Sequence, residues 1–536
     1  MNSRSIPFDR LPFTDLYRGY INRSPEVMQY FSGHPFSDHA VREHASRFHF
    51  PGDRDQSVEA LLHFNRQLGA GSQVTAQLER LRDPDSLVVV TGQQLTIYGG
   101  PLFTVYKTMT TLLYARRWEE LLQRPVVPVF WLADEDHDYP EAAELGLLAN
   151  DTFEQLSLNN GSGLPVGREI LGDSYLVFEE KFFDRLPESD FSDEIRALLT
   201  RHYREGATFR SAFGGLLLHL FEKHGLVLAG SDDPEIKSLI SRPLRAAADN
   251  PEGLSEALES QSLALENAGF GRQALVQPSN LFYIDSDGGR QKLDLEGDTW
   301  SNGNGQVWSR EELRRAVEAN PERFSPNVFL RPMLQDQLLP TLAYVCGPGE
   351  LAYYAQMKGA YQWAGQQMPM LLPRISGTLV EPAVERVMKK LPFEFEEYES
   401  RTEDLETAYL KRSVPEGGGD LFADWRREST RLAEDAKSRA KEIDPTLEAS
   451  ADKTETRIQQ QIDQLQQKVT RAVKRREATQ IQRIHRVREN LFPGGKLQER
   501  QLSFVYYMNR YGTDLLDRML EVLGEEVPDS HKVIGL

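Results

Sequence analysis

The sequence predicts an α/β protein built on a mostly parallel, doubly wound sheet with inserted subdomains, followed by a C-terminal helical coiled coil. Short apolar runs of strand length alternate with helix-like segments over most of the chain. Glycines and capping residues mark the ends of these segments. After about residue 385 the composition becomes charged and rich in glutamine, which is typical of exposed helices.

The first strand is expected over residues 86–90, an apolar run that ends before Gly92. Gly99-Gly100 then forms a turn, and Pro101 suits the first turn of a helix that runs to about Trp118. A strand, a glycine turn and a helix in this order present backbone N–H groups to an anion or a polar substrate. Neither the Walker spacing nor GxGxxG is present, so the geometry predicts a site without naming its ligand.

The remaining core elements continue this alternation. Further strands are expected at residues 126–133, 226–230, 341–346 and 368–372. Helices are expected near 141–148, at 209–224, after the capping sequence 231–234, and from Gly347 to about Ala364. Because strand and helix alternate, the strands should be parallel neighbours in one sheet.

The chain is expected to divide into three parts. Residues 1–385 form the core, with polar, turn-rich insertions at about 151–207 and 270–330 that shape a substrate cleft. Residues 386–490 form the helical coiled coil, in which Gly417–Gly419 is a flexible joint. Residues 491–536 are a C-terminal segment that packs back on the core and contains an amphipathic helix to about Val522.

Two helices, at residues 420–442 and 446–490, make up the expected coiled coil, and Pro445 separates them. The seam consists of residues with 4-3-4-3 spacing: Ile458, Ile462, Leu465, Val469 and Ala472. The apolar face is thin, which indicates two antiparallel helices or pairing with a second subunit. We therefore expect a homodimer held through this region.

Composition excludes several classes of protein. The chain has 536 residues and a net charge of −19, which argues against nucleic acid as the main partner because phosphate binding needs a basic surface. The one cysteine, Cys346, excludes an internal disulfide and any CxxC motif. No signal region or membrane-spanning run is found, so a cytoplasmic location and no membrane partner are expected.

The densest polar cluster, Asp134–Asp138, follows the second expected strand. Ligands of doubly wound sheets sit at the carboxyl ends of strands. Four carboxylates and His137 there could bind an ammonium group, hold a divalent metal or perform acid–base work. The alternative is a solvated turn followed by the acidic start of the helix at Glu141, which the helix dipole favours.

A second cluster flanks the fourth expected strand. Arg331 and Asp336 precede it, and Tyr344 to Glu350 end it with glycines that let backbone approach a ligand. Arg374, after the fifth strand, could clamp a carboxylate or phosphate. The alternatives are a glycine turn with a helix-start glutamate, and a surface salt bridge at Arg374.

A third candidate site is the sequence Phe492–Lys496, together with Arg500, Asn509 and Arg510. A Gly-Gly turn with adjacent cations can bind an anion. The turn could equally be the loop that closes the long helix.

Several of these segments, in this order, resemble the bacillithiol-biosynthesis family that adds cysteine to glucosaminyl-malate (BshC). The matching segments are 91–94 with 99–107, 128–138, 325–328, 330–336, 344–350, 373–374, 491–500 and 509–512. The resemblance spans nearly the whole chain, including its length and the late coiled coil. It departs at Cys346, where the family pattern suggests a small residue such as glycine.

The resemblance implies a Rossmann-like core with connecting inserts and a coiled coil that builds a dimer. It also implies the last step of bacillithiol synthesis, an amide bond between the carboxylate of L-cysteine and the amine of glucosaminyl-malate. A carboxylate is inert toward an amine until it is activated as an acyl-adenylate or acyl-phosphate. We therefore expect ATP as the activator, which Mg²⁺ could accompany.

These arguments assign candidate residues to roles. The catalytic candidates are Glu135, Asp136 and His137, with His137 or a neighbouring carboxylate as the base. The substrate-binding candidates are Gln93, Gln94, Asp134, Asp138, Arg331, Asp336, Tyr344, Glu350 and Arg374. The nucleotide-binding candidates are Gly99, Gly100 and Lys107, or alternatively Gly494, Gly495, Lys496 and Arg510. No resident metal site is expected.

Two other functions compete with the cysteine ligase. One is a metal-dependent hydrolase centred on Asp134–Asp138, which would lose activity on chelation. The other is a non-catalytic coiled-coil scaffold, which would bind no small molecule at its core. The polar clusters at several strand ends argue against the scaffold.

Overall fold

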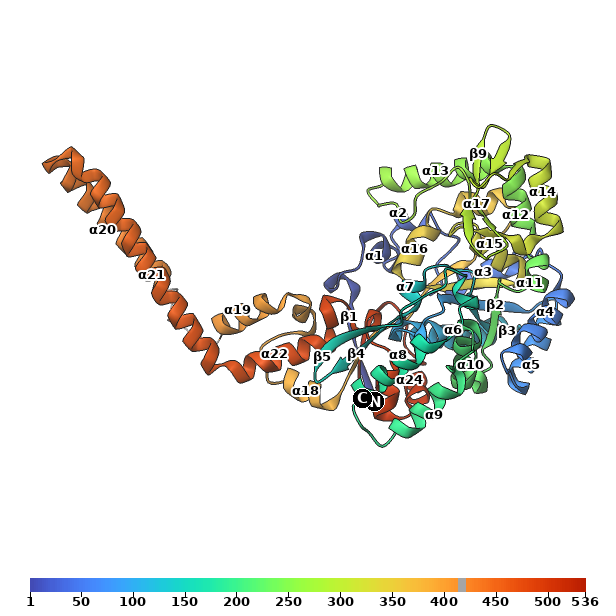
Figure 1. Ribbon diagram of the computed structural model, residues 1–536, viewed down its shortest axis with the longest axis horizontal. Helices are drawn as coiled ribbons and strands as arrows, with labels where there is room; N and C mark the ends of the chain where they lie inside the picture. The colour runs from blue at the N-terminus through green and yellow to red at the C-terminus, as the bar shows by residue number, and fades with distance from the viewer. Residues whose placement is uncertain (413–420) are drawn as a thin grey trace. The chain divides into compact units, whose positions relative to one another are not determined.

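A computed structural model describes residues 1–412 and 421–536 (Figure 1). The chain forms two compact units, one of residues 1–379 with 497–536 and the other of residues 380–496. The joint expected at Gly417–Gly419 lies outside the described residues. Within the described parts, no helix combines the length and the apolar character needed to cross a membrane.

A five-stranded sheet forms the centre of the first unit, in the order β14-β13-β2-β3-β6. All neighbouring strands in it are parallel, so the predicted fold class is confirmed. Its strands are β2 (Leu87–Gln94), β3 (Val126–Ala133), β6 (Val227–Gly230), β13 (Thr341–Cys346) and β14 (Met370–Pro373). The order along the chain reverses between β2 and β13, which makes this pair the topological switch point of the sheet.

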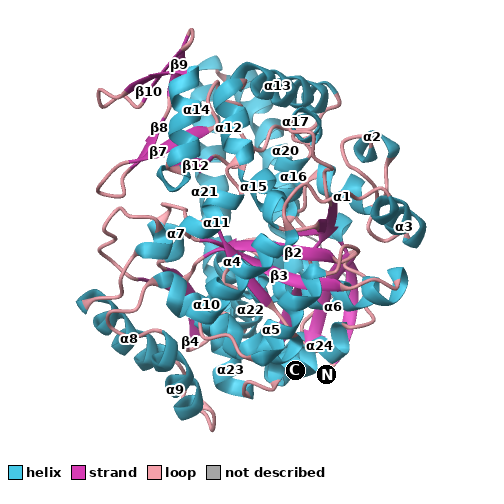
Figure 2. Ribbon diagram, turned by 90° about the vertical axis from the view of Figure 1, so that its right-hand side faces the viewer, coloured by secondary structure: helices cyan, strands magenta, loops and turns pink. Residues whose placement is uncertain are grey.

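Helices connect the parallel strands and cover the sheet (Figure 2). The connections are α6 (Leu102–Leu122), α10 (Phe209–Phe221), α16 (Pro348–Tyr354) and α17 (Lys358–Trp363). Trp118 of α6 packs with Leu87 and Val89 on one face. The Phe130 and Phe213 rings lie 5.9 Å apart, which places α10 against β3. The strands are apolar throughout because both faces of the sheet are buried.

The two chain termini pair with each other in a smaller sheet that the sequence analysis did not predict. Strand β1 (Asn2–Pro7) pairs antiparallel with β16 (Ser530–Gly535), and β15 (Ser376–Val380) completes the sheet. The termini therefore lie side by side (Figures 1 and 2). The helices before the central sheet are α1 (Asp15–Ile21), α2 (Pro25–Met28), α3 (Asp38–Ser46), α4 (Arg54–Gln67) and α5 (Ser72–Glu79).

Two expected helices are wrong in detail. Residues 141–148 were expected to be helical, but α7 (Tyr139–Ala142) is short and β4 (Glu144–Ala149) pairs antiparallel with β5 (Thr152–Ser157). Asn150 and Asp151 between them have φ values of 50° and 62°, as a tight hairpin turn requires. The expected helix from Gly347 to Ala364 is broken into α16 and α17 around Gln356, whose side chain bonds to Ser262 and Ala274.

The insertions carry their own secondary structure. Residues 151–207 include α8 (Asp173–Arg185) and α9 (Ser192–His202). After β6 come α11 (Pro234–Leu239), α12 (Arg242–Asp249) and α13 (Pro251–Asn267). The second insertion contains β7 (Leu281–Ile284), β8 (Arg290–Lys292), β9 (Asp294–Glu296), β10 (Thr299–Ser301), β11 (Val307–Ser309), α14 (Arg310–Ala319) and β12 (Phe324–Pro326). Helix α15 (Arg331–Leu338) leads into β13.

The second unit is helical. Its helices are α18 (Pro382–Met388), α19 (Thr402–Arg412), α20 (Leu421–Ile443), α21 (Glu448–Arg476) and α22 (Ala478–Leu491). Helices α20 and α21 form an antiparallel hairpin, since Lys437 pairs with Asp452 at 2.5 Å and Arg426 with Asp463 at 2.8 Å. The C-terminal residues of the first unit form α23 (Phe504–Tyr511) and α24 (Leu515–Leu523) before β16, where one helix to about Val522 was expected.

Candidate active site

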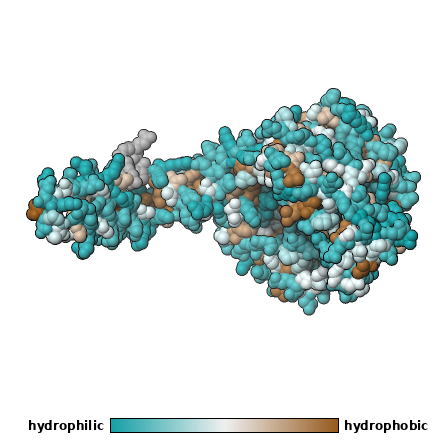
Figure 3. Space-filling view, turned by 90° about the horizontal axis from the view of Figure 1, so that it is seen from above, coloured by the Kyte–Doolittle hydropathy of each residue, from teal (hydrophilic) through white to brown (hydrophobic). Residues whose placement is uncertain are grey.

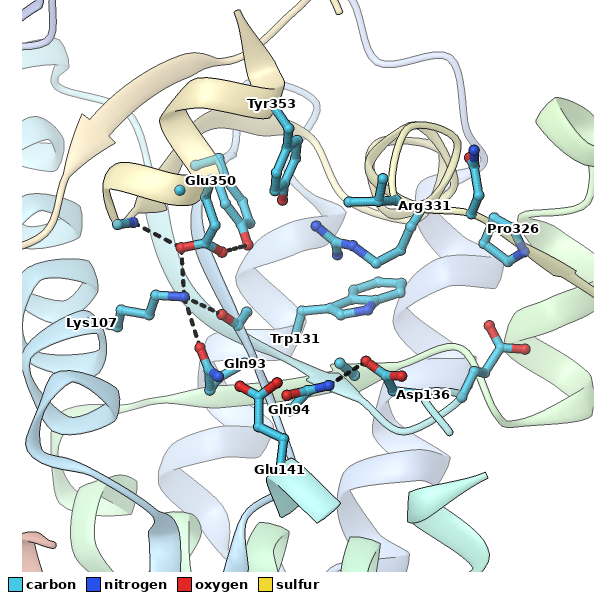
Figure 4. Close-up of a pocket in the computed structure, with 18 of the residues that line it drawn as sticks. Gln93, Gln94, Lys107, Trp131, Asp136, Glu141, Pro326, Arg331, Glu350 and Tyr353 are labelled. Carbon is cyan, nitrogen blue, oxygen red and sulfur yellow. Dashed lines mark hydrogen bonds and ion pairs between the residues drawn. The ribbon is translucent and has the colours of Figure 1, made fainter. Parts of the chain in front are cut away.

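The carboxyl ends of all five central strands border one cavity of about 670 Å³ (Figure 4). Doubly wound sheets bind ligands at this edge, next to the switch point, and the volume lies within the range of small-molecule sites. Residues at or just beyond the strand ends supply much of the lining: Gly92, Gln93, Gln94, Trp131, Ala133, Ser231, Tyr344, Gly347, Glu350 and Arg374.

Lys107 reaches the cavity from α6 and is only 3% exposed. Its ammonium donates to the backbone oxygen of Gly92 (2.8 Å) and to Oε1 of Gln93 (3.0 Å), and it pairs with Oε2 of Glu350 (2.6 Å). Burial lowers the pKa of Lys107, while the Glu350 carboxylate opposes that shift. A lysine has three N–H donors, so these three acceptors occupy the ammonium fully.

The Glu350 carboxylate ties α16 to the end of β13. It accepts hydrogen bonds from the Tyr344 hydroxyl (2.6 Å) and the Gly347 backbone N–H (2.8 Å), in addition to the Lys107 pair. The Gly347 turn therefore positions Glu350 in the first turn of its helix. Together, Lys107 and Glu350 link β2, α6 and β13 across the switch point.

Asp136 faces the cavity after β3 and accepts three hydrogen bonds. Its Oδ2 accepts from Gln94 Nε2 (2.6 Å), and its Oδ1 accepts from the backbone N–H groups of His137 (2.7 Å) and Asp138 (3.2 Å). This network fixes the carboxylate in one orientation while leaving acceptor capacity toward the cavity.

Two further acidic residues of this turn, Glu135 and Asp134, are fixed by residues that follow β6. Ser231 donates to Glu135 (2.6 Å), and the buried Lys237 forms an ion pair with it. Asp134 is fully buried and accepts from the backbone N–H groups of Ser231 and Asp232 (both 3.1 Å). Burial, together with the Asp232 carboxylate, raises the pKa of Asp134 to about 7.

Glu141, on the short helix α7, lines the mouth of the cavity. In the part of the chain that the structure describes, no cation forms a direct ion pair with it, although the Arg500 guanidinium, which also lines the cavity, opposes the rise in its pKa. Desolvation, with the nearby carboxylates of Asp138 and Asp136, raises the pKa of Glu141 above its usual value. Its side chain points into the cavity near Gln93 and Gln94 (Figure 4).

Cationic side chains approach the cavity from other elements. Arg331, at the start of α15, lies 5.7 Å from the centroid of the Tyr344 ring, and Arg290 of β8 also lines the cavity. Neither forms an ion pair with a carboxylate of the described residues. Arg374, by contrast, is buried and paired with Glu499 at 2.6 Å.

Two family models together match almost the entire chain. The model described as "Bacillithiol biosynthesis BshC, N-terminal Rossmann-like domain" matches residues 1–375, and "Bacillithiol biosynthesis BshC, C-terminal coiled-coil domain" matches residues 377–536. The chain therefore belongs to the bacillithiol-biosynthesis BshC family. Its Rossmann-like core and coiled coil are thus family features, as the sequence resemblance implied.

Relatives in this family share about a third of their residues with the chain. A protein of Salinibacter ruber is 36% identical over 98% of this chain and 96% of the relative. A protein of Chlorobaculum tepidum is 34% identical over 90% and 89%, and one of Koribacter versatilis is 32% identical over 99% of both. Each of the three bears the name "Putative cysteine ligase BshC".

The cavity brings together most of the candidates that sequence analysis placed at strand ends. These residues are Gln93, Gln94, Lys107, Glu135, Asp136, Arg331, Tyr344, Glu350 and Arg374. They come from four strand ends and three helices, so the common edge of the BshC sheet, rather than proximity in sequence, assembles them.

Four other candidates lie outside the cavity lining. Asp134 is buried beneath it, and Asp138 caps α7 by accepting from the Glu141 backbone N–H. Asp336 is buried and accepts from the Tyr361 hydroxyl at 2.7 Å; burial raises its pKa to about 6. The His137 ring nitrogens face the backbone oxygens of Glu135 (3.0 Å) and Gly288 (3.4 Å) rather than the cavity.

The Gly99-Gly100 turn is also outside the cavity lining. Its N–H groups are already used inside the protein: Gly99 donates to Thr96 and to the Tyr203 hydroxyl, and Gly100 donates to Ile97. The Leu102 N–H at the start of α6 donates to the Leu502 oxygen. The turn therefore offers a phosphate few free donors.

The alternative glycine turn is exposed. Gly494 and Gly495 have φ values of 59° and 81°, and Lys496 beside them is exposed, with no ion-pair partner among the described side chains. This turn belongs to residues 380–496, whereas Arg510 lies on α23 of the other unit. The backbone N–H groups of Gly495 and Lys496 donate to the oxygens of Phe492 and Pro493, so the exposed Lys496 ammonium is the group that this turn offers an anion.

Sequence reasoning missed several lining residues as site candidates: Phe103, Trp131, Glu141, Arg290, Ser325 and Asn327. Arg500, which the sequence placed with the glycine turn at Gly494–Lys496, lines this cavity instead. Trp131 stands three residues before the acidic cluster, near the carboxyl end of a buried strand. An aromatic residue with an N–H donor at that position is a signal that the sequence offered. Arg290 comes from a polar insertion, where nothing in the local sequence distinguishes it from a solvated arginine.

The metal-dependent hydrolase has no matching site. Across residues 1–412 and 421–536, no three side chains of His, Cys, Asp or Glu are grouped so that they could hold a metal ion. Asp134 and Glu135 instead pair with backbone N–H groups and Lys237.

Replacing Gly100 by alanine should destabilise the fold without changing ligand affinity. A Cβ there would lie 2.0 Å from Oγ1 of Thr96, at a φ of +71°, so we expect a loss of about 1–3 kcal/mol in the free energy of unfolding. Thermal denaturation and titration with ATP would measure both effects. Gly172→Ala, at φ −115° in open space, is the matched control; weaker ATP binding at unchanged stability would restore Gly100 as a nucleotide site.

Proposed function

We propose that this chain is an ATP-dependent ligase that joins the carboxyl group of L-cysteine to the amine of glucosaminyl-malate, the last step of bacillithiol biosynthesis. Membership of the BshC family and the names of the relatives support the pathway and the reaction class. The chemistry of the cavity supports the assignment of the two substrates and of the base.

The observation that carries the proposal is the charge arrangement in the cavity. Figure 4 shows Arg331 on one side of Trp131 and the carboxylates of Asp136 and Glu141 on the other. Both proposed substrates carry an amine and at least one carboxylate. A cavity that offers unpaired charges of both signs matches such molecules, because each ligand group would meet an opposite charge.

In the proposed reaction the activated carboxyl carbon of cysteine is attacked by the sugar amine. The C–N bond forms, the bond from that carbon to its activating group breaks, and the amine gives up a proton. A base in the cavity must take this proton. Glu141 fits this role, because it faces the cavity, has a raised pKa and forms no direct ion pair among the described residues. The Arg500 guanidinium opposes the rise in its pKa without reversing it.

The proposed reaction needs ATP because the cysteine carboxylate must be activated before an amine can attack it. The Gly99-Gly100 turn does not fit a phosphate, because its N–H groups are occupied, and Lys107 has no free donor. The remaining candidate is the exposed turn at Gly494–Lys496, where the Lys496 ammonium rather than the backbone N–H groups would meet a phosphate. A reaction that consumes free cysteine and ATP would take place in the cytoplasm.

The test of the proposal is incubation of the purified protein with L-cysteine, glucosaminyl-malate and ATP, with detection of bacillithiol by mass. Product that requires all three compounds is the expected result. Samples that lack ATP, or contain a non-hydrolysable analogue, test the activation step. No product from folded protein at any concentration of the three would exclude the ligase.

Replacing Asp136 by asparagine should raise the KM for the amine substrate by about 10- to 100-fold. The carboxylate is aimed into the cavity by Gln94 and two backbone N–H groups, and a hydrogen bond to a charged group contributes about 1.5–3 kcal/mol. Steady-state kinetics would measure the change. Asp138→Asn is the control, since Asp138 caps α7 outside the cavity; equal effects of the two substitutions would contradict a binding role for Asp136.

The coiled-coil hairpin should hold a homodimer. Ile458, Leu465 and Val469 remain 40–42% exposed along α21, and Trp425 of α20 is 47% exposed. Trp425, Ile458 and Leu465 border a groove in a hairpin surface that is otherwise mostly hydrophilic in Figure 3. A second copy covering this apolar seam would remove it from water.

Leu465→Glu combined with Val469→Glu should therefore give monomers, measured by sedimentation at micromolar concentration. Gln467→Glu adds a charge at an exposed position between them and should leave the dimer intact. A wild-type protein that sediments as a monomer would contradict the proposal.

A further inference from the structure

We propose that Arg290, Arg331 and Trp131 form one subsite that binds the two carboxylates of the acceptor and makes the enzyme specific for an acceptor that carries them. The inference rests on the proposed function, in which the acceptor bears a malate group. Two of these residues, Arg290 and Trp131, were not among the site candidates from the sequence.

Arg290 is held by neutral contacts, and the carboxylates of Asp136 and Glu135 act on it without forming a direct ion pair. Its guanidinium carbon lies 3.6 Å from the centroid of the Phe282 ring. Its Nε donates to Ser325 Oγ (3.0 Å) and its Nη2 to the Pro326 oxygen (2.7 Å). An arginine has five N–H donors, so donors remain for a ligand in the cavity, and no carboxylate of the described residues pairs with them.

Arg331 is held by the same stretch of chain. Helix α15 begins at Arg331, only a few residues after Ser325 and Pro326, which anchor Arg290. Its Nη1 makes a long contact of 3.3 Å with Gln335 Oε1, and no carboxylate in the described chain forms an ion pair with it. Figure 4 shows its guanidinium projecting into the cavity.

Trp131 supplies an independent observation that points to a ligand. The residue is 1% exposed, and its indole N–H is buried without a hydrogen-bond partner. A buried donor without an acceptor is costly and rare. The indole lines the same cavity as Arg331 (Figure 4), so a ligand oxygen bound there could accept this hydrogen bond.

These three groups have the chemistry of a dicarboxylate site. Planar guanidinium groups bind carboxylates through paired hydrogen bonds, and two neighbouring cations favour a ligand with two negative charges. Two other cavity cations are already paired with carboxylates, Lys107 with Glu350 and Arg374 with Glu499. A third, Arg500, acts on Glu141 and opposes the rise in its pKa. Arg290 and Arg331 are therefore the cavity cations whose charges a bound dianion would best neutralise.

The experiment compares binding of glucosaminyl-malate and of L-malate to the wild type and to Arg290→Gln, Arg331→Gln and Trp131→Phe by calorimetry. We expect each arginine substitution to weaken both ligands about 10- to 100-fold, as loss of a charged hydrogen bond predicts, and Trp131→Phe to weaken them less. The melting temperature of each variant shows whether it is folded.

Arg323→Gln is the matched control. Arg323 belongs to the same insertion, lies 5.0 Å from the Tyr283 ring centroid and donates to the Ile284 oxygen (3.0 Å). Its contacts thus copy those of Arg290, but it does not line the cavity. Affinity for both malate ligands should be unchanged in Arg323→Gln.

Kinetics test the specificity. Arg290→Gln should raise the KM for glucosaminyl-malate while the KM for cysteine stays constant. A methyl glucosaminide, which lacks the carboxylates, should react equally poorly with the wild type and the variant. If the wild type uses both acceptors equally well, the subsite does not determine specificity and the inference fails.

Two binding results would overturn the inference. One is unchanged malate affinity in folded Arg290→Gln and Arg331→Gln. The other is that these substitutions weaken binding of AMP or inorganic phosphate and leave malate binding intact, which would assign the cations to a nucleotide. Malate binding that depends on both arginines, in a protein that makes no product from cysteine and ATP, would support the subsite and reject only the ligase.

Discussion

Replacing Glu141 by glutamine should lower kcat by about 10²- to 10⁴-fold, the usual effect of losing a positioned acid–base group. Glutamine keeps the shape of the side chain but cannot accept the proton of the attacking amine. Binding of both substrates should change much less than kcat, since Asp136 remains as a carboxylate in the cavity. Single-turnover kinetics would separate this chemical step from binding.

The pH profile gives the same residue a second test. Desolvation and the neighbouring carboxylates raise the pKa of Glu141 above its usual value of 4.5, and a base must be ionised to act. Activity should therefore fall as the pH is lowered through this raised pKa, and this acid limb should be absent in Glu141→Gln.

Glu144→Gln is the control for Glu141. Glu144 is exposed at the start of β4, three residues along the chain, and contacts Gln155. Near wild-type kcat in Glu141→Gln, with the acid limb retained, would move the base to another group, with Asp136 as the next carboxylate in the cavity.

The central sheet could be predicted because parallel strands buried on both faces leave a strong signal. The runs at Val88–Val90 and Val126–Leu132 are almost uninterrupted apolar sequences. The sheet of β1, β15 and β16 could not, since it joins residues from opposite ends of the chain. Residues 144–149 read equally well as helix or strand until their pairing with β5 is known.

The candidate site was predictable where chemistry follows a strand end, as at Gln93, Asp136 and Glu350. The topology of the sheet carries such residues to a common edge. Arg290 reaches the site through a long-range contact with Pro326, and Glu499 holds the lining residue Arg374 from far along the chain. The local sequence does not indicate either contact.

The turn at Gly99-Gly100 was predicted to be a binding site from its sequence, but its backbone donors are already used. Gly99 and Gly100 look like an anion site because helix α6 follows them. In the structure, Tyr203 and the segment around Leu502 take up the donors. Glycine at position 100 is instead required by its left-handed φ and by the contact with Thr96.

Replacing Glu499 by glutamine should lower the free energy of unfolding by about 3–5 kcal/mol, as expected when one partner of a buried ion pair is removed. Glu499 is 0% exposed and pairs with Arg374 at 2.6 Å. It also accepts from the Gly377 N–H (2.7 Å) and the Ser376 hydroxyl (3.0 Å). Glutamine would leave the Arg374 charge buried without a counterion.

Acid should weaken the wild type and the variant differently. Burial alone would raise the pKa of Glu499, but the Arg374 guanidinium and the Gly377 N–H hold it below 4.5. A lowered pKa contributes stability that is present above the unfolded pKa and is lost as the pH falls through the folded one. Denaturant unfolding below pH 4.5 should therefore show a smaller acid loss in Glu499→Gln.

A double substitution separates the ion pair from the packing around it. Adding Arg374→Met to Glu499→Gln removes the uncompensated charge, so the pair of changes should cost less than Glu499→Gln alone. Glu521→Gln, at an exposed position on α24, should change the free energy of unfolding by less than about 0.5 kcal/mol. The free energy lost in the double variant could instead equal the sum of the losses in the two single variants. Arg374 and Glu499 would then stabilise the sheet edge independently rather than as a charge pair.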